Sequence, residues 1–430
     1  MANLPAGWFD RARRWHEQLV TAFVAVGIVV LPLIFFPGQP DVFRLPKTIA
    51  FRAEAILIAA VTLMAIALGA RLPRITWRDR WVAIPLATIG LTALLTALST
   101  NRLVSIDALV STVATAVVFF ATLFVAPRRG WFLLALPLGA AVINTLLVIV
   151  EELDLWMPFG TQPGLKHHLQ CSALLGNPNE IGSYLGAAAL ACVAGALVMR
   201  SMKLGAIASL LIVGLIVSQT LTALIAFAAA LFMLFAMTSV RAALKAAVIT
   251  AIVAIVIVMS VAPLRTRVTN MLLWARSGNY NAVVTERLTP FLAAWEMFTD
   301  HPIAGVGPGA FGWQYYDYKL RVEAHLPELR NAFNRGVNFG EVHNDHLQLL
   351  AEGGVIGYLC FLALLTALAS IWFEPPRATR DARAEFARRL AMPLVVFVFV
   401  LSIAQFPIET TVVRSLIVHL AALCVGWRNA

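Results

Sequence analysis

Three observations predict an all-α fold, a polytopic bundle of about twelve transmembrane helices. Of the 430 residues, 60% are apolar and only 13% are charged, which is too little charge to cover a soluble protein of this size. Apolar runs of about 18–22 residues recur from end to end, each long enough to cross roughly 30 Å of hydrocarbon. Basic residues gather in every second connector. The predicted spans are 18–36, 48–70, 81–99, 106–126, 131–150, 180–199, 204–218, 220–238, 246–262, 347–372, 391–406 and 412–427.

The distribution of arginine and lysine predicts which side each connector faces. One alternating set of connectors is strongly basic, and its members are 71–80, 127–130, 200–203, 239–245 and 373–390. The other set holds few basic residues. Because Lys and Arg concentrate in cytoplasmic connectors, the basic set and both termini are predicted to be cytoplasmic. The first apolar stretch is expected to remain as a helix, because it ends in Phe35-Phe36-Pro37-Gly38 and not in a small-residue cleavage site.

The same rule explains the net charge of +10. A basic surface can bind nucleic acid, but in a membrane protein an excess of Arg and Lys is the usual mark of cytoplasmic connectors. We therefore expect membrane lipids, and no nucleic acid, as partners.

Two long loops interrupt the short connectors, and both fall on the extracytoplasmic side. They are 151–179 and the much longer 263–345, which divides the chain into 1–262 with nine spans, the loop itself, and 346–430 with three spans. Long loops in a compact protein are usually functional. Within the second loop, 284–298 has apolar residues at helical spacing, which fits a helix lying at the membrane interface or a core-packing helix equally well.

The end of this loop carries the strongest candidate for acid–base chemistry. Gly340-Glu341-Val342-His343-Asn344-Asp345-His346 leads directly into the tenth span. Asn344 is a natural N-cap, and the positive end of the helix dipole would keep His343 neutral and able to accept a proton near pH 7. A capping cluster with a surface histidine is the structural alternative. His343 and His346 have no evident third ligand, so a metal site is not expected.

Basic residues at the outward membrane surface are candidates for binding an anion. Lys47 and Arg52 flank the start of the second span, Arg265 follows the ninth, and Arg287 precedes the amphipathic segment. A guanidinium offers a bidentate fork to phosphate. Singly, each of these side chains could equally be an anchor at the membrane edge.

Two further residues are expected to support such a site. Asn177 precedes Pro178 and is predicted to cap the sixth span, with outward amides that could receive an anion. Glu352, followed by Gly353 and Gly354, lies inside the tenth span. A carboxylate within a membrane is a functional candidate, although Glu352 could also anchor a neighbouring loop.

Together these segments resemble the bacterial O-antigen ligase and O-antigen polymerase superfamily, and most of all the lipopolysaccharide O-antigen ligases. The resemblance is specific over about 170–360 and topological elsewhere. One departure is Ser218-Gln219-Thr220, where many relatives carry a Ser-Arg pair. The matching residues are Gly176-Asn177-Pro178-Asn179, Arg287, Trp295, Pro302, Gly305, Gly307, His343-Asn344, Leu347, Glu352, Gly353 and Gly357.

The resemblance implies a membrane glycosyltransferase of GT-C-like architecture in the bacterial inner membrane, with its active site facing the periplasm. The donor would be undecaprenyl-diphosphate-linked O-antigen and the acceptor a sugar hydroxyl of lipid A–core. In this interpretation His343 is the base, and Arg265, Arg287, Lys47 and Arg52 hold the diphosphate. The reaction would invert the anomeric centre and need no metal or other cofactor, because arginines supply the positive charge.

Three alternatives remain open from the sequence. Within the superfamily, a polymerase would extend one carrier-linked glycan with another, and a protein O-oligosaccharyltransferase would use a protein hydroxyl. A twelve-helix transporter belongs to a different class. It is disfavoured because the connector at 200–203 is short and no half-to-half repeat is found.

Overall fold

The computed structural model describes residues 8–38, 41–70, 79–156, 171–330, 338–374 and 381–428. Within these ranges every regular element is a helix, as the composition predicts. Parts of three predicted connectors, 71–78, 157–170 and 375–380, lie outside the described residues. The elements are α1 (Trp8–Val30), α2 (Arg44–Ala67), α3 (Arg80–Leu98), α4 (Arg102–Glu152), α6 (Pro178–Met199), α7 (Met202–Val217), α8 (Leu221–Ala236), α9 (Val240–Ser260), α10 (Ala262–Arg276), α11 (Tyr280–Val283), α12 (Leu288–Asp300), α13 (Phe311–His325), η1 (Pro327–Leu329), α15 (Asp345–Ala369), η2 (Ser370–Phe373), α16 (Ala382–Leu401) and α17 (Thr411–Trp427).

Most predicted spans coincide with these helices, but α1 begins ten residues before the predicted span 18–36, and α16 begins nine residues before the predicted span 391–406. Six helical segments in the described ranges are long and apolar enough to cross a membrane: 44–67, 80–98, 102–152, 178–199, 241–260 and 345–373. The helices α7, α8 and α17 are shorter but equally apolar. The chain is therefore an all-α polytopic membrane protein.

One predicted connector is itself helical. Spans 106–126 and 131–150 run together as α4, whose 51 residues would extend about 75 Å if straight. The junction falls at Pro127, which cannot donate a backbone hydrogen bond. Pro127 therefore leaves the carbonyl of Leu123 without its usual donor four residues later. Beside this junction the carbonyl of Ala126 accepts the indole N–H of Trp427, at 2.9 Å. The expectation of a non-helical break at 127–130 was thus wrong, because Arg128 and Arg129 keep helical backbone.

Helix α6 lies at the centre of the bundle because small residues line it on every side. Gly182, Gly186 and a run of alanines allow α7, α8, α16 and α17 to pack closely around it. A side chain at Gly186 would meet Phe397 of α16, and one at Gly182 would meet Thr220 at the start of α8. The core of the protein is built around this helix.

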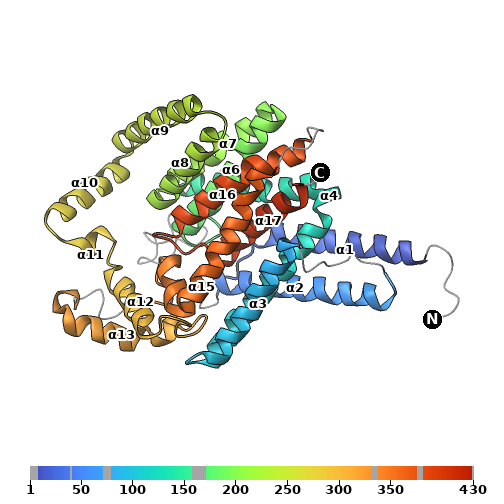
Figure 1. Cartoon of the computed structure of the whole chain (residues 1–430). Helices are drawn as coiled ribbons and strands as arrows, with labels where there is room; N and C mark the ends of the chain where they lie inside the picture. Colours follow the sequence, from blue (N-terminus) through green and yellow to red (C-terminus); the bar gives the residue numbers. More distant parts are fainter. Residues whose placement is uncertain are drawn as a thin grey trace.

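The long segment 263–345 contains helices rather than open loop (Figure 1). Helices α9 and α10 form an arm at the side of the bundle, and α9 packs only on α8 and α10 among the elements with substantial contacts. Helix α12, close to the predicted 284–298 helix, buries Ala293, Ala294 and Met297 and packs on α13 and α15. Its inner face is therefore core packing, while Trp295 stays half exposed.

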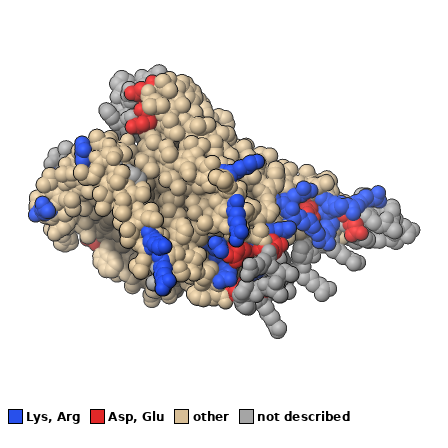
Figure 2. Space-filling view, turned by 90° about the horizontal axis from the view of Figure 1, so that it is seen from above, with Lys and Arg blue, Asp and Glu red and all other residues tan. Residues whose placement is uncertain are grey.

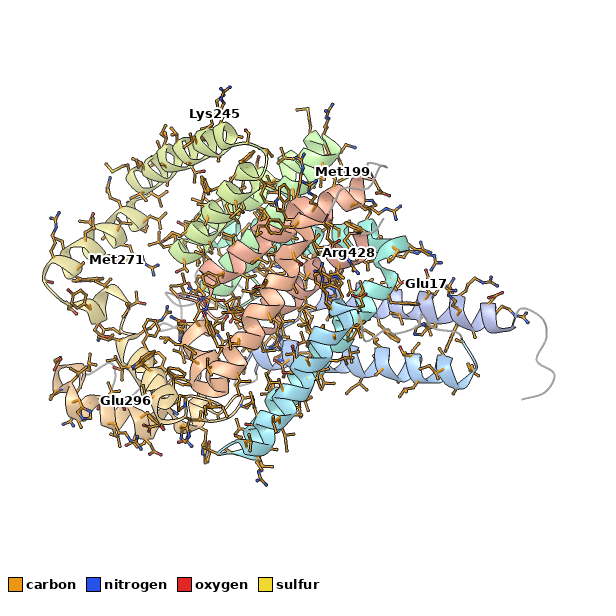
Figure 3. The ribbon with its side chains drawn as sticks, viewed as in Figure 1. Glu17, Met199, Lys245, Met271, Glu296 and Arg428 are labelled. Atoms are coloured by element: carbon orange, nitrogen blue, oxygen red, sulfur yellow. The ribbon has the colours of Figure 1, made fainter. Side chains whose placement is uncertain are left out.

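The helix ends fall on two sides of the molecule. Figure 3 shows Met199 of α6, Lys245 of α9 and Arg428 after α17 on the side away from Glu296 of α12. On the same side as α12 lie the start of α2, the start of α15 and the loops next to α12. These segments carry the candidate site.

Candidate active site

The segment that enters α15 is fixed by its own polar side chains. Asn344 is the N-cap, as predicted, and its side chain accepts the backbone N–H of Leu347 at 3.0 Å. Asp345 is buried and accepts hydrogen bonds from the Ser402 hydroxyl at 3.0 Å and the Ile408 N–H at 3.2 Å. The turn between α16 and α17 therefore holds this segment in place.

The ring of His343 is held in one orientation. Its backbone has φ +63°, a left-handed conformation that is uncommon for residues other than glycine and recurs at functional sites. The ring packs edge-on against Phe406 and Phe339, with centroids 4.6 and 5.7 Å away. Its Nδ1 lies 3.1 Å from the carbonyl of Glu341. Because a carbonyl only accepts, Nδ1 carries the proton, and Nε2 keeps a lone pair.

The surroundings of His343 keep the imidazole uncharged. Burial, followed by the positive charge of Arg287, lowers the pKa of His343 to about 4. Arg44 acts in the same direction, while the Glu341 carbonyl opposes it. At neutral pH the side chain is therefore a neutral acceptor, because burial and the two arginines disfavour its charged form.

Arg287 and Arg267 form a pair of cations without a counter-ion. Arg287 is the N-cap residue of α12, and burial together with Arg267 lowers the pKa of its guanidinium to about 10, so that it remains charged. Neither guanidinium makes an ion pair or side-chain hydrogen bond with any residue in the described ranges. Arg287 is near the neutral imidazole of His343 and Arg267 is near Arg287, and two such neighbouring guanidiniums are suited to binding an anion.

The sequence identified Arg287 but chose Arg265 as its neighbour. In the structure both α10 arginines are exposed; Arg265 donates to the carbonyl of Met259 at 3.2 Å, whereas Arg267 acts on Arg287. The two α10 residues are two positions apart, so they point to nearly opposite faces of the helix. The position of the α9–α10 arm beside the bundle therefore decides whether the Arg265 face or the Arg267 face of α10 lies toward Arg287.

Arg44 was not predicted as a site residue, yet it joins three segments here. Its Nε lies 2.9 Å from Glu180 of α6, and its Nη1 lies 2.9 Å from Glu341. Its guanidinium also lies over the ring of Phe406, 5.3 Å from the centroid. Arg44 therefore contacts both groups that hold His343, the Glu341 segment and the Phe406 ring.

Lys47 and Arg52, the two remaining predicted phosphate ligands, already have protein partners. The buried ammonium of Lys47 donates to the carbonyls of Ile34 and Leu174, at 2.6 and 2.8 Å. Arg52 forms a two-pronged pair with Asp107, with both contacts at 2.7 Å. These contacts distinguish them from Arg267 and Arg287.

The second histidine of the segment faces away from His343. His346 lies with Nε2 3.0 Å from the carbonyl of Phe399, and its Nδ1 is 3.2 Å from the Tyr358 hydroxyl. Both ring nitrogens are therefore engaged between α15 and α16, and the two histidines do not form a shared site.

The two predicted supporting residues have clear structural positions. Asn177 caps α6, as predicted, by accepting the N–H of Asn179 at 2.8 Å. Glu352 accepts the N–H groups of Gly309 and Phe311, at 2.7 and 3.2 Å, and so anchors the start of α13. These contacts match the second role considered for Glu352, in which it anchors a neighbouring loop.

Helix α15 is broken directly after Glu352. Gly354 has φ +60° and ψ −163°, which removes it from the helix. The freed N–H of Val355 donates to the carbonyl of Pro302 at 2.8 Å, and the carbonyl of Glu352 accepts the N–H of Gly307 at 3.0 Å. The break therefore docks segment 302–311 onto α15, and explains the glycine at position 354, where a Cβ would meet the backbone of Ile303.

An apolar groove of about 560 Å³ runs between α3, α4, α15 and α17. One end is lined by Arg52, Glu352, Glu409 and Arg414 and the other by Arg80 and Trp81. Along α3 it extends from Trp81 to Leu95, about 21 Å at 1.5 Å per residue. Such a groove could hold a hydrocarbon chain with its polar end near the turn that carries Phe406.

Residues 204–362 match the family model Wzy_C, described as O-antigen ligase. This segment of the chain is therefore similar to the O-antigen ligase domain. Members of the O-antigen ligase family are glycosyltransferase-like membrane enzymes. The matched residues include His343, Arg267, Arg287 and Glu352, whereas Arg44 precedes the O-antigen ligase domain. A search of curated proteins finds no match.

Proposed function

We propose that this protein transfers a glycan from undecaprenyl diphosphate to a sugar hydroxyl of lipid A–core, at the periplasmic face of the inner membrane. The observation that carries the proposal is the neutral imidazole of His343 near the guanidinium of Arg287, which in turn lies near Arg267. A glycosyl diphosphate needs positive charge where its leaving group develops negative charge, and a base for the attacking hydroxyl. The O-antigen ligase match supports the same chemistry.

In the proposed step, Nε2 of His343 accepts the proton of the acceptor hydroxyl. The hydroxyl oxygen forms a bond to the anomeric carbon while the bond from that carbon to the diphosphate oxygen breaks. The bonding electrons leave with the diphosphate, whose charge Arg267 and Arg287 stabilise. Attack opposite the leaving group inverts the anomeric centre. The apolar groove offers a surface for a lipid chain, and the arginines allow the reaction to proceed without a divalent metal.

The acceptor distinguishes this proposal from the related activities. Purified protein in liposomes would be given undecaprenyl-diphosphate-linked glycan and, separately, lipid A–core, a second carrier-linked glycan, or a pilin-type protein. We expect glycan transfer to lipid A–core alone. Transfer between carrier-linked glycans would identify a polymerase, and modification of protein would identify an O-oligosaccharyltransferase. In either case lipid A–core would not be the acceptor.

The base is tested with a matched pair of histidine variants. His343→Ala should lower the rate of transfer by at least about 10²-fold, the usual contribution of a general base. His325→Ala is the control, because His325 lies on α13 with its Nδ1 against the carbonyl of Arg321. Equal rates for the two variants, at equal folded amounts, would remove His343 from the mechanism.

Added chelator should leave the wild-type rate unchanged.

A further inference from the structure

A second polar hollow lies at the end of the bundle opposite to His343. It has a volume of about 600 Å³ and is enclosed by the first half of α1 and the middle of α4. Its position follows from helix packing, because Ala12 of α1 packs beside Ala65 and Ala70 at the far end of α2. Helix α2 begins at Arg44 in the candidate site and is about 36 Å long. The hollow is therefore separate from the catalytic cluster.

Four arginines line this hollow against two carboxylates. Arg13 and Arg14 come from α1, and Arg128 and Arg129 come from α4, while Asp10 and Glu17 supply the negative charge. The hollow therefore has an excess of two positive charges. Figure 2 shows Lys and Arg gathered with a few acidic residues around the N-terminal end of α1, at the right of the view.

Only one of the four arginines is paired within the described part of the chain. Glu17 points from α1 toward α4 (Figure 3) and lies 2.8 Å from Nη1 of Arg128. No ion pair or side-chain hydrogen bond joins Arg13, Arg14 or Arg129 to any described residue. Three guanidiniums from two helices therefore line one hollow with donors that no described side chain uses, and as exposed or half-buried groups they are accessible to an anion.

The hollow is open to the membrane as well as to water. Phe132, half exposed, is part of its lining, and Thr21 forms its border toward the apolar part of α1. Arg128 and Arg129 lie in the middle of a helix that is otherwise apolar enough to span a membrane. A ligand with both phosphate groups and acyl chains would fit this combination of arginines and exposed apolar surface, whereas a soluble anion would leave Phe132 uncovered.

We propose that this hollow binds the headgroup of an anionic phospholipid carrying two phosphates, of the cardiolipin type. The two phosphate charges match the excess of two positive charges, and each phosphate can accept a bidentate fork from an arginine. The acyl chains would cover Phe132 and the neighbouring apolar surface of α1 and α4. The lipid bridges α1 and α4, whose arginines repel one another without it.

The test is lipid binding by the full-length protein, measured by native mass spectrometry and by thermal unfolding in detergent. Cardiolipin, phosphatidylglycerol, phosphatidylcholine and inorganic diphosphate are added separately. We expect cardiolipin to bind most tightly and to raise the unfolding temperature, with phosphatidylglycerol weaker and phosphatidylcholine without effect. The variant Arg13→Gln/Arg129→Gln should bind cardiolipin roughly twenty- to thirtyfold more weakly, at about fivefold for each arginine lost.

The control is Arg200→Gln/Lys203→Gln, which removes the same charge from another basic connector, between α6 and α7. It should keep wild-type affinity. Without lipid, the Arg13/Arg129 variant should unfold no earlier than wild type, because repulsion between α1 and α4 is reduced. Equal weakening in both variants would overturn the proposal, since the effect would then be net charge alone. Equal binding of phosphatidylglycerol, or full competition by inorganic diphosphate, would overturn the choice of a two-phosphate lipid.

Discussion

The guanidinium of Arg44 lies 2.9 Å from the carboxylate of Glu341, two residues before His343. The same guanidinium contacts Glu180 of α6 and lies over Phe406, which packs on the His343 ring. The start of α2 is thus bonded to the central helix of the bundle and to the candidate base. A small movement of Glu341 would displace the His343 ring, because the Glu341 carbonyl accepts its Nδ1–H.

Glu341 is therefore predicted to act as a positioning residue. Glu341→Ala removes the contact with Arg44 and should lower kcat by roughly 10- to 100-fold, because catalysis is sensitive to displacements of about 1 Å. Glu341→Gln keeps an oxygen that can accept from Arg44 and should retain most of the rate. Steady-state kinetics of glycan transfer distinguish the two, with KM for the donor changing little. An unchanged kcat in Glu341→Ala would contradict the role.

The pair of α10 arginines gives a sharper test of the anion site. Arg267→Ala should weaken binding of undecaprenyl diphosphate by about 10- to 100-fold, since a charged hydrogen bond is worth roughly 1.5–3 kcal/mol. Arg265→Ala should change it by less than about twofold, because Arg265 bonds to the backbone at the surface of the arm. Binding can be followed by calorimetry in detergent. The reverse order would assign the site to the face of α10 that carries Arg265.

Much of the fold could be predicted from the sequence alone. The apolar runs located the membrane helices, and Asn177-Pro178 and Asn344 marked helix starts, because capping is decided by neighbouring residues. The same local information failed at 127–130, where Pro127 and two arginines resemble a connector. The helix nevertheless continues through Pro127, and the Trp427 indole of α17 packs against it there by donating to the Ala126 carbonyl.

The candidate site could be predicted in part, because His343 and Arg287 were each named from the residues around them. His343 stood out from its own segment, whereas Arg44, Glu180 and Arg267 come from three other helices. Lys47 and Arg52 were chosen from their place at a helix start. Their partners, the Leu174 carbonyl and Asp107, are remote in sequence and could not be foreseen.

The pH dependence of transfer should report on His343. The base must be unprotonated, so the rate falls as pH drops through the pKa of His343, which is about 4 in the free protein. A bound diphosphate would offset the charge of Arg287, raise that pKa, and move the acid limb of kcat to higher pH than that of kcat/KM. Rates measured from pH 4 to 8 test this. The diphosphate of the donor also titrates, so its own pKa is measured separately by ³¹P NMR. With that titration accounted for, acid limbs of kcat and kcat/KM at the same pH would contradict the role of His343.

The break in α15 predicts a specific failure of folding. In Gly354→Ala, the new Cβ would meet the carbonyl of Ile303 in a backbone conformation that only glycine adopts readily. We expect the free energy of unfolding to fall by at least about 1–3 kcal/mol. Gly90→Ala is the control, because a Cβ at Gly90 of α3 meets nothing within 4 Å. Thermal unfolding in detergent compares them, and equal midpoints would show that the break is not needed.

The most direct measurement of the central claim is the position of the diphosphate in a structure of the protein bound to undecaprenyl diphosphate. We predict phosphate oxygens within about 2.7–2.9 Å of the guanidiniums of both Arg267 and Arg287, with Nε2 of His343 facing the oxygen that carries the glycan. A diphosphate bound elsewhere, such as at Arg52 and Arg414 in the groove, with Nε2 of His343 turned away from it, would contradict the proposed reaction.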